Sequence, residues 1–384
     1  MYVCKIGGEF VMNKPKLIFV VRWDKDKKKT WSGTTYALFE ELNKYFTVEE
    51  FQLIEPMTTR LKRKINKSLH ANIFREDFQI NLLEKADYNF KKQYGDVPQI
   101  IFQFGEKPIT NNSYNFIFLD LCVKAIYDLK NNNPDFFALT EFGNFSQKDI
   151  ISRMDEQQKY FNNCSAIFTM GTWLKEYIIE TCKVPRNKVF AVGGGINVKN
   201  ESYVKVNKNR RKFLFVGRNF KRKGGERVVE AFKILRKSYV CDAELYIAGP
   251  KENKWKNIEG ITFLGDISSE ELVKYYNLCD VFCMPSYFEA YGLVFGEALC
   301  YGLPCIGRNV YAMPEFIQNG VNGYLIDSDE VDELCQKMRL ILQEDTIFKN
   351  VSESRAEYIE RYSWKNVGEK IYKVINEKAK IDEV

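Results

Sequence analysis

The feature that most constrains the fold of this chain is a stretch at residues 281–302, which joins an apolar run, a loop and a helix pattern. Val281–Met284 is the kind of short apolar run that forms a buried parallel strand, and the helix pattern that follows stops at Gly302. The loop holds one carboxylate, Glu289, and the helix holds a second, Glu297, with seven residues between them. Strand, loop and helix in this order predict an α/β domain whose loop faces a ligand crevice.

These two carboxylates suit the recognition of a sugar nucleotide. Gly292 stands beside the predicted helix start, where backbone N–H groups and the positive end of the helix dipole can face an anion. A carboxylate in the loop suits a sugar hydroxyl, and one in the first turns of the helix suits a ribose diol. We therefore predict a site for a sugar attached to a nucleoside diphosphate.

The same residues carry a resemblance to a known family. The string E-A-Y-G-L-V-F-G-E-A-L, followed by G-L-P, resembles the paired-glutamate signature of glycosyltransferase family 4, the retaining group 1 glycosyl transferases of the GT-B fold. The resemblance covers most of Lys16–Lys378 and is strongest after Ser165. It implies an α/β chain of two Rossmann-like, doubly wound domains that face a central cleft.

The 384 residues are long enough for two such domains. Gly193–Gly195 is a natural hinge, and the polar segment 198–210 separates two apolar patterns. We expect an acceptor-binding domain over residues 12–197 and a donor-binding domain over residues 211–361. The resemblance implies that a C-terminal helix at about 362–380 packs back on the first domain.

The first domain is predicted to open with a strand at Lys16–Val21, followed by a helix that begins after Ser32-Gly33-Thr34. Many relatives have two glycines in that loop, whereas this chain has Gly33 alone. Asp24-Lys25-Asp26 matches the D-x-D metal motif of GT-A enzymes, but the lysines that follow disfavour a cation, so we interpret it as surface loop. Residues 1–11 match no element well.

Asp120 is a candidate for orienting the acceptor. It ends the predicted strand Asn115–Leu119, near the position where many family members have a histidine. The single histidine of this chain, His70, lies in another segment and is expected at the surface. Asp120 can equally be a polar strand end or a helix cap, so both interpretations stand.

The net charge of +6 permits anionic partners. The sequence has no recognised nucleic-acid-binding motif and no long basic arm, which argues against nucleic acid as a partner. The basic segment Arg60–Lys67 is either a solvated surface or a contact for anionic lipid or a phosphate-bearing acceptor. No apolar run reaches bilayer length, no signal peptide is evident, and the 10 cysteines are scattered. We expect a cytoplasmic protein, with peripheral membrane contact left open.

One group of cysteines raises the question of a zinc site. The four lie in apolar strand or helix patterns, where cysteine behaves as a small hydrophobic residue, so packing is the preferred interpretation. The group consists of Cys279, Cys283, Cys300 and Cys305.

The donor domain is predicted to begin with a strand at Lys212–Val216, a basic glycine-containing loop and a helix. This combination makes a phosphate cradle from backbone donors, a helix dipole and cations. Arg218 and Lys223 match the family's diphosphate-binding arginine and lysine, whereas Lys221 and Arg222 are interpreted as solvated.

The resemblance assigns roles to particular residues. Glu289 binds sugar hydroxyls, Glu297 binds the ribose, and the amides of Tyr291–Leu293 lie near the phosphates, with no metal or cofactor required. The implied catalytic residues are Arg218, Lys223 and Glu289. The implied donor-binding residues are Gly33, Gly217, Glu289, Ala290, Tyr291, Gly292, Leu293 and Glu297.

The function that follows is metal-independent, retaining transfer of a hexose from a GDP- or UDP-sugar to a glycan, lipid-linked or other hydroxyl acceptor. Two alternatives stand beside it: a non-catalytic module that binds sugar nucleotide or membrane, and a GT-B nucleotide-sugar epimerase. A nicotinamide-dependent oxidoreductase is disfavoured because no G-x-G-x-x-G follows the first predicted strand.

Overall fold

The computed structural model describes most of the chain. Side chains are described for residues 14–54, 57, 61, 64–65, 88–95, 97–104, 113–197, 210–250, 255 and 257–381, and the backbone alone for 3–6 and 9–12. Most of the basic segment Arg60–Lys67 lies outside these residues, and so do His70 and the linker residues 198–209.

The first sheet has the strand order β4-β3-β5-β6-β7-β8 among the described residues, with every neighbouring pair parallel. Its inner strands β3, β5 and β7 are largely apolar, because helices cover both faces of a parallel sheet, whereas the edge strand β4 is mostly polar. The strands are β3 (Lys16–Val21), β4 (Thr47–Gln52), β5 (Ile100–Gln103), β6 (Tyr114–Leu119), β7 (Ala166–Thr169) and β8 (Val189–Ala191). The helices are α1 (Thr34–Leu42), α4 (Val123–Asn132), α5 (Pro134–Ala138), α6 (Gln147–Asn163) and α7 (Thr172–Glu180).

The second sheet has the order β11-β10-β9-β12-β13-β14 and is also parallel throughout its described pairs. This is the strand order of a Rossmann fold. The strands are β9 (Lys212–Val216), β10 (Glu244–Ala248), β11 (Ile261–Gly265), β12 (Val281–Cys283), β13 (Cys305–Arg308) and β14 (Gly323–Ile326). The helices are α8 (Gly225–Ser238), α9 (Ser269–Leu278), α10 (Leu293–Cys300), α11 (Met313–Phe316), α12 (Val331–Gln343), α13 (Asp345–Glu353) and α14 (Arg355–Arg361).

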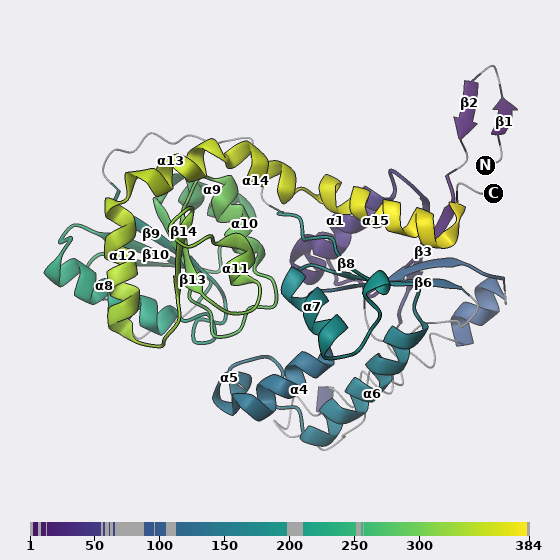
Figure 1. The fold of residues 1–384 in the computed structure, drawn as a ribbon, viewed down its shortest axis with the longest axis horizontal. Helices are drawn as coiled ribbons and strands as arrows, with labels where there is room; N and C mark the ends of the chain where they lie inside the picture. Colours follow the sequence, from purple (N-terminus) through teal and green to yellow (C-terminus); the bar gives the residue numbers. More distant parts are fainter. Residues whose placement is uncertain are drawn as a thin grey trace.

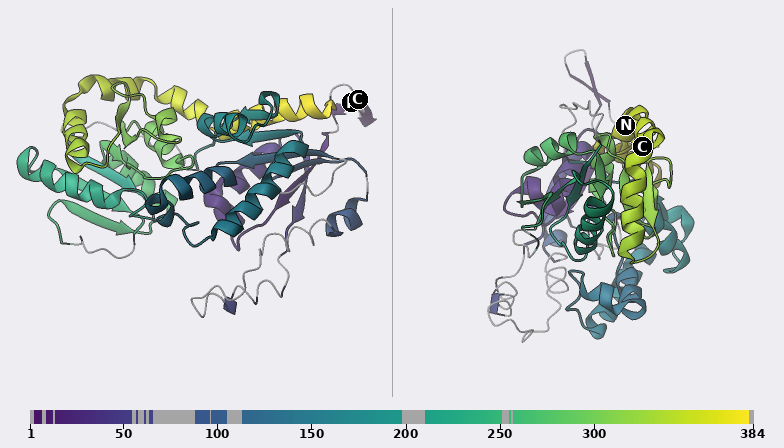
Figure 2. Two further views of the ribbon diagram at one scale, coloured as in Figure 1. Left: turned by 60° about the horizontal axis from the view of Figure 1, so that its bottom comes forward. Right: turned by 90° about the vertical axis from the view of Figure 1, so that its left-hand side faces the viewer.

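The two units lie side by side, and the last helix joins them (Figures 1 and 2). α15 (Trp364–Ala379) leaves the second unit after α14 and runs across the first, where Tyr372 stacks on Tyr45 with ring centroids 4.8 Å apart. The backbone N–H of Ile196 donates to the carbonyl of Tyr362 at 2.9 Å, which ties the inter-domain linker to this crossing segment.

The predicted strands and helices quoted above appear within one or two residues of their expected ends. The N-terminus differs, since β1 (Val3–Ile6) and β2 (Glu9–Met12) form an antiparallel hairpin in a stretch that matched no element. A four-residue strand is too short to give a clear alternation, so only its pairing reveals it. Within the described part of the chain, no helix is both long and apolar enough to cross a bilayer.

Candidate active site

Lys223 and Glu289 meet at the carboxyl ends of β9 and β12, where the order of the second sheet reverses. Lys223 Nζ donates to Glu289 Oε2 at 2.9 Å and lies 3.5 Å from Met284 Sδ. The two side chains are only 14% and 12% exposed. The predicted pair is therefore brought together at the switch point of a doubly wound sheet, where such folds bind ligands.

Arg222 corrects the sequence analysis, which interpreted it as solvated. Its side chain is 13% exposed, its Nη1 lies 3.6 Å from Glu289 Oε2, and it donates to the carbonyl of Phe288. Arg222 is buried by a tertiary contact. The backbone N–H of Tyr287 donates to the carbonyl of Arg222 at 2.9 Å, so the loop that carries Glu289 covers this residue. A run of basic residues does not reveal which member a later loop will cover.

The ionisation of Glu289 follows from these neighbours. Burial by itself raises the pKa of a carboxyl group, but the positive charges of Lys223 and Arg222 outweigh it and hold the pKa of Glu289 below its usual value. The site thus keeps a buried carboxylate ionised, and an ionised carboxylate can accept hydrogen bonds from hydroxyl groups.

Arg218 lies apart from this cluster. Its side chain is 80% exposed, and its Nε donates to Asp266 Oδ1 at 3.0 Å. Gly217, by contrast, lies directly against the site, because a Cβ placed on it would stand 2.1 Å from Lys223 Cδ. The structure therefore joins Gly217, Lys223 and Glu289 and leaves the predicted arginine on the rim.

Glu297 lies inside α10 and is 7% exposed. It accepts a hydrogen bond from Tyr276 Oη at 2.8 Å. Burial raises the pKa of Glu297, opposed by the bond from Tyr276 and by one from the backbone N–H of Asn197. Gly292 precedes the helix with φ 94°, a left-handed conformation that favours glycine, and no side chain caps the helix start.

Two further predicted donor residues, Ala290 and Tyr291, contact the first domain. Trp173 Nε1 donates to the carbonyl of Ala290 at 2.8 Å, and the backbone N–H of Gly194 donates to Tyr291 Oη at 3.1 Å. Gly194 belongs to the predicted hinge, so the glutamate loop and the hinge are in direct contact. Movement of one domain would therefore change the loop that holds Glu289.

A carboxylate of the second domain caps a helix of the first. Glu315 in α11 accepts from the backbone N–H groups of Thr172 at 2.8 Å and Trp173 at 2.6 Å, the first residues of α7. Gly171, the N-cap, has no side chain to do this. Glu315 thus supplies a helix cap and an inter-domain contact at once.

We expect Glu315→Ala to destabilise the chain by about 1 to 2 kcal/mol, because two N–H groups at the start of α7 lose their acceptor. Thermal unfolding measures this. Glu357→Ala, at an exposed position of α14, is the matched control and should leave the midpoint unchanged. Equal midpoints for both variants would contradict the role of Glu315.

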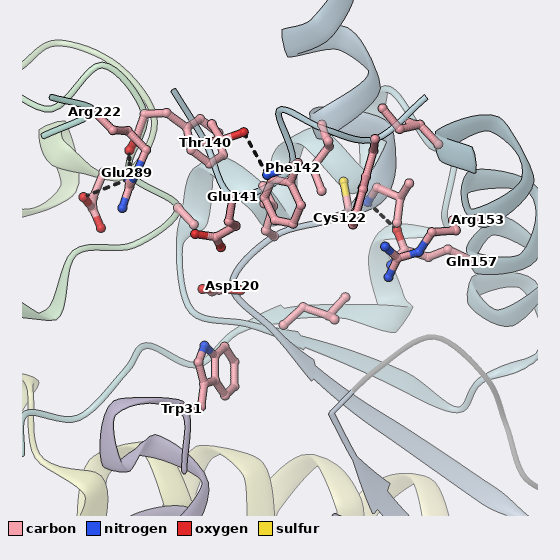
Figure 3. Close-up of a pocket in the computed structure, with 18 residues that line it drawn as sticks. Trp31, Asp120, Cys122, Thr140, Glu141, Phe142, Arg153, Gln157, Arg222 and Glu289 are labelled. Carbon is pink, nitrogen blue, oxygen red and sulfur yellow. Dashed lines mark hydrogen bonds and ion pairs between the residues drawn. The ribbon is translucent and has the colours of Figure 1, made fainter. Parts of the chain in front are cut away.

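A cavity of about 280 Å³ lies between the domains, and Glu289 is at one end of it (Figure 3). Asp120, which follows β6, and Glu141 face it from the first domain, and Trp31 closes it from below in this view. Burial chiefly, with Glu141 and Glu289 nearby, raises the pKa of Asp120 to about 7. The predicted acceptor residue thus shares a cavity with the predicted donor residue.

The loop that carries Trp31 has an unusual backbone. Trp31, Ser32 and Gly33 have φ values of 47°, 56° and 90°, all left-handed. For residues other than glycine this costs about 1 to 2 kcal/mol each. Asn197 holds the turn by donating from Nδ2 to the carbonyl of Ser32 at 2.7 Å, while Trp364 Nε1 donates to Asn197 Oδ1 at 2.8 Å. Gly33 therefore acts as part of a clamped turn that precedes α1.

Other groups flagged in the sequence have structural partners. Asp26 of the D-x-D match accepts from the backbone N–H of Lys28 at 3.1 Å and so caps the 3₁₀ segment Lys27–Gly33. The described residues include no cluster of three or more metal-ligating side chains. The four grouped cysteines are fully buried in the apolar core of the second domain: Cys279, Cys283, Cys300 and Cys305.

Sequence reasoning missed several residues of this region besides Arg222. Trp31, Glu141 and Arg153 line the cavity without belonging to a motif. Arg227 lies beneath the glutamate loop, donates to the carbonyl of Pro285 at 2.9 Å and places its guanidinium 4.5 Å from the ring centroid of Tyr287. In the sequence Arg227 stands between two other charged residues of α8, Glu226 and Glu230, so no local signal marked it.

Two parallel, doubly wound sheets with a site between them define the GT-B fold, as expected. Sucrose-phosphate synthase of Thermosynechococcus elongatus matches with a TM-score of 0.70, 15% identity and coverage of 96% of this chain and 100% of that one. Anabaena Alr3699/HepE, solved in complex with UDP and glucose, matches with a TM-score of 0.61, 14% identity and coverage of 94% and 99%. At these identities the likeness concerns the fold.

The sequence profile of the family Glycosyl transferases group 1 matches residues 199–364. An uncharacterised glycosyltransferase of Methanocaldococcus jannaschii is 27% identical over 246 residues, which are 56% of this chain and 62% of that relative. The alignment thus spans about three fifths of the relative's length. Over its second domain the chain thus matches the group 1 glycosyl transferases, in agreement with the resemblance found in the sequence.

The contact between Gly217 and Lys223 gives a prediction for this site. In Gly217→Ala the new Cβ should displace the lysine side chain from Glu289, and transfer should fall by about 10²-fold because the charge is misplaced. The obstacle is a flexible side chain, so the unfolding midpoint should change little. Assays of transfer and thermal unfolding on one preparation test both parts, and unchanged transfer would refute the assignment.

Proposed function

We propose that this chain transfers a hexosyl group from a nucleoside-diphosphate sugar to a hydroxyl acceptor, with retention of configuration and without a metal ion. The observation that carries the proposal is the buried pair of Lys223 and Glu289, 2.9 Å apart, at one end of the inter-domain cavity. A fixed cation beside a carboxylate suits a leaving diphosphate and the hydroxyls of the sugar it leaves. UDP-sugars are the first donors to test, since HepE was solved with UDP and glucose.

In the proposed reaction the bond between the anomeric carbon and the diphosphate oxygen breaks as the acceptor oxygen bonds to the same face. The acceptor proton passes to the departing phosphate. Lys223 and the N–H groups at the start of α10 would stabilise the negative charge that grows there. Glu289 would hold sugar hydroxyls, and Glu297 would hold the ribose after exchanging one of its present partners.

Arg218 has a conditional role in this scheme. Its exposed side chain is paired with Asp266, and a surface pair of this kind contributes little to stability. We propose that the guanidinium leaves Asp266 for the donor diphosphate. Asp120, across the cavity from Glu289, would orient the acceptor hydroxyl.

The test is a panel of UDP-, GDP- and ADP-sugars with a chelator present, read by thermal shift and by release of the nucleoside diphosphate. One donor should stabilise the protein and turn over slowly to water, with retention visible in the anomeric configuration of the product. Stabilisation without release would favour a non-catalytic binding module. Conversion of the donor to an isomeric sugar nucleotide would favour the epimerase, and no stabilisation by any donor would reject the proposal.

A further inference from the structure

A second cavity, of about 360 Å³, lies on the other side of Trp31 at the carboxyl edge of the first sheet. Trp31, Leu119 and Asp120 line both this cavity and the one that contains Glu289. The two spaces therefore share one wall, and that wall includes the carboxylate proposed to orient the acceptor.

The lining of the second cavity is mainly apolar, unlike that of the first. The ends of four strands of the first sheet supply Val20, Val21, Leu53, Phe104 and Phe118. The polar residues are Arg22, Thr30, Thr35 and the shared Asp120, and the hydroxyl of Thr30 already accepts from the backbone N–H of Asp24 at 3.0 Å. Besides the shared Asp120, the first cavity presents two further carboxylates, Glu141 and Glu289.

Trp31 is fixed in this wall from two directions. Its ring packs edge-on against Phe104 and Phe118, with centroid separations of 5.6 Å and 5.9 Å. Its backbone belongs to the left-handed turn that Asn197 clamps. Strain of this kind persists where the surroundings enforce it and is concentrated at ligand sites. Its indole nitrogen points toward Asp120 (Figure 3).

We propose that Trp31 divides the acceptor site in two, so that the acceptor is a hydroxyl compound with an apolar group beside its reactive end. The reactive hydroxyl lies at Asp120 in the first cavity, and the apolar group crosses Trp31 into the second. This inference rests on the proposed transfer reaction for the identity of the first cavity. The apolar group of the acceptor supplies binding affinity, and the indole of Trp31 sets the orientation of the acceptor.

Binding of alkyl glucosides tests the second cavity without requiring turnover. We would record ligand-observed NMR of methyl and octyl β-D-glucopyranoside, below micelle-forming concentrations, with the full chain. Magnetisation should transfer to the octyl protons, and octyl should bind tenfold or more tighter than methyl, since each fully buried methylene contributes roughly a fourfold gain. Equal affinity of the two glucosides would overturn the proposal.

Leu53 offers matched variants outside the donor machinery. Leu53→Trp should fill the second cavity and abolish the preference for octyl, whereas Leu53→Ala should enlarge the cavity and keep that preference. Both should leave the release of nucleoside diphosphate to water unchanged, and thermal unfolding checks that each is folded. An octyl preference that persists in folded Leu53→Trp would place the alkyl chain elsewhere and reject the site.

Once a donor is known, the role of Trp31 can be tested by measuring KM and kcat separately for variants of this residue. Trp31→Phe should keep the wall and the octyl preference. Trp31→Ala should join the cavities, raise the KM for the octyl glucoside severalfold and increase the share of donor lost to water. If no donor turns over but octyl binding depends on Leu53 as expected, the proposed reaction fails while the apolar cavity stands.

Discussion

Lys223→Ala is expected to lower glycosyl transfer by about 10²- to 10³-fold, the size of effect seen when one preorganised charge-stabilising group is removed. Lys223 Nζ contacts Glu289 at 2.9 Å in a site where both side chains are largely buried. Its loss removes a cation aimed at the leaving group and leaves Glu289 with Arg222 alone. The decrease should appear in kcat, because additional negative charge develops on the leaving phosphate as the bond breaks.

Lys221→Ala is the matched control for this experiment. Lys221 lies in the same loop and is exposed, so its removal should alter neither transfer nor stability measurably. Both variants lower the net charge of the loop by one, so any difference between their transfer rates reports the position of the lost charge. If Lys223→Ala and Lys221→Ala retain similar transfer rates, Lys223 does not serve the leaving group.

Asp120→Asn is expected to make the chain less active but more stable above neutral pH. The pKa of Asp120 is about 7, raised mainly by burial from an ordinary value of 3.8. The folded state therefore holds this proton more strongly than the unfolded state. The contribution of Asp120 to the free energy of unfolding is fully present below about pH 4 and is lost as the pH rises to about 7. The shift corresponds to an upper limit of about 4 kcal/mol. Asparagine carries no charge and avoids this loss.

Thermal unfolding at pH 5 and pH 8 checks the sign. The advantage of Asp120→Asn over the original chain should be larger at pH 8, while transfer should fall because a neutral amide replaces the carboxylate that orients the acceptor hydroxyl. Glu141→Gln is the companion variant, since Glu141 helps to raise the pKa of Asp120 and its removal should lower it. A stability advantage that does not change with pH would show that Asp120 is not the group responsible.

The fold followed from patterns that repeat along the chain. Strands such as Lys16–Val21 and Lys212–Val216 are uninterrupted apolar runs, and each precedes a loop and a helix pattern. The hairpin at Val3–Met12 was missed because its strands are short and depend on each other for pairing. Helices α4 and α5 were not predicted either, although Val123 and Ile126 of α4 line the first cavity.

The site was predictable where one loop contains both the residue and its signal. Glu289, Lys223 and Gly217 belong to local motifs, and the two loops meet because strands β9 and β12 are hydrogen-bonded neighbours. Arg218 and Arg222 show the limit of that reasoning. They lie four residues apart in one basic loop, and the sequence analysis assigned Arg218 to the diphosphate and Arg222 to solvent. In the structure a covering loop buries Arg222 and leaves Arg218 exposed.

By itself, therefore, the sequence determined the two doubly wound units, the glutamate loop and the lysine that faces it, because each depends on residues close together in the chain. Only the tertiary structure decided the inter-domain features: the cap from Glu315 to α7, the clamp of Asn197 on the turn of Trp31, and the two cavities that share Asp120. These contacts join residues far apart in sequence, and their energies depend on burial and on neighbouring charges, which exist only after both domains have packed.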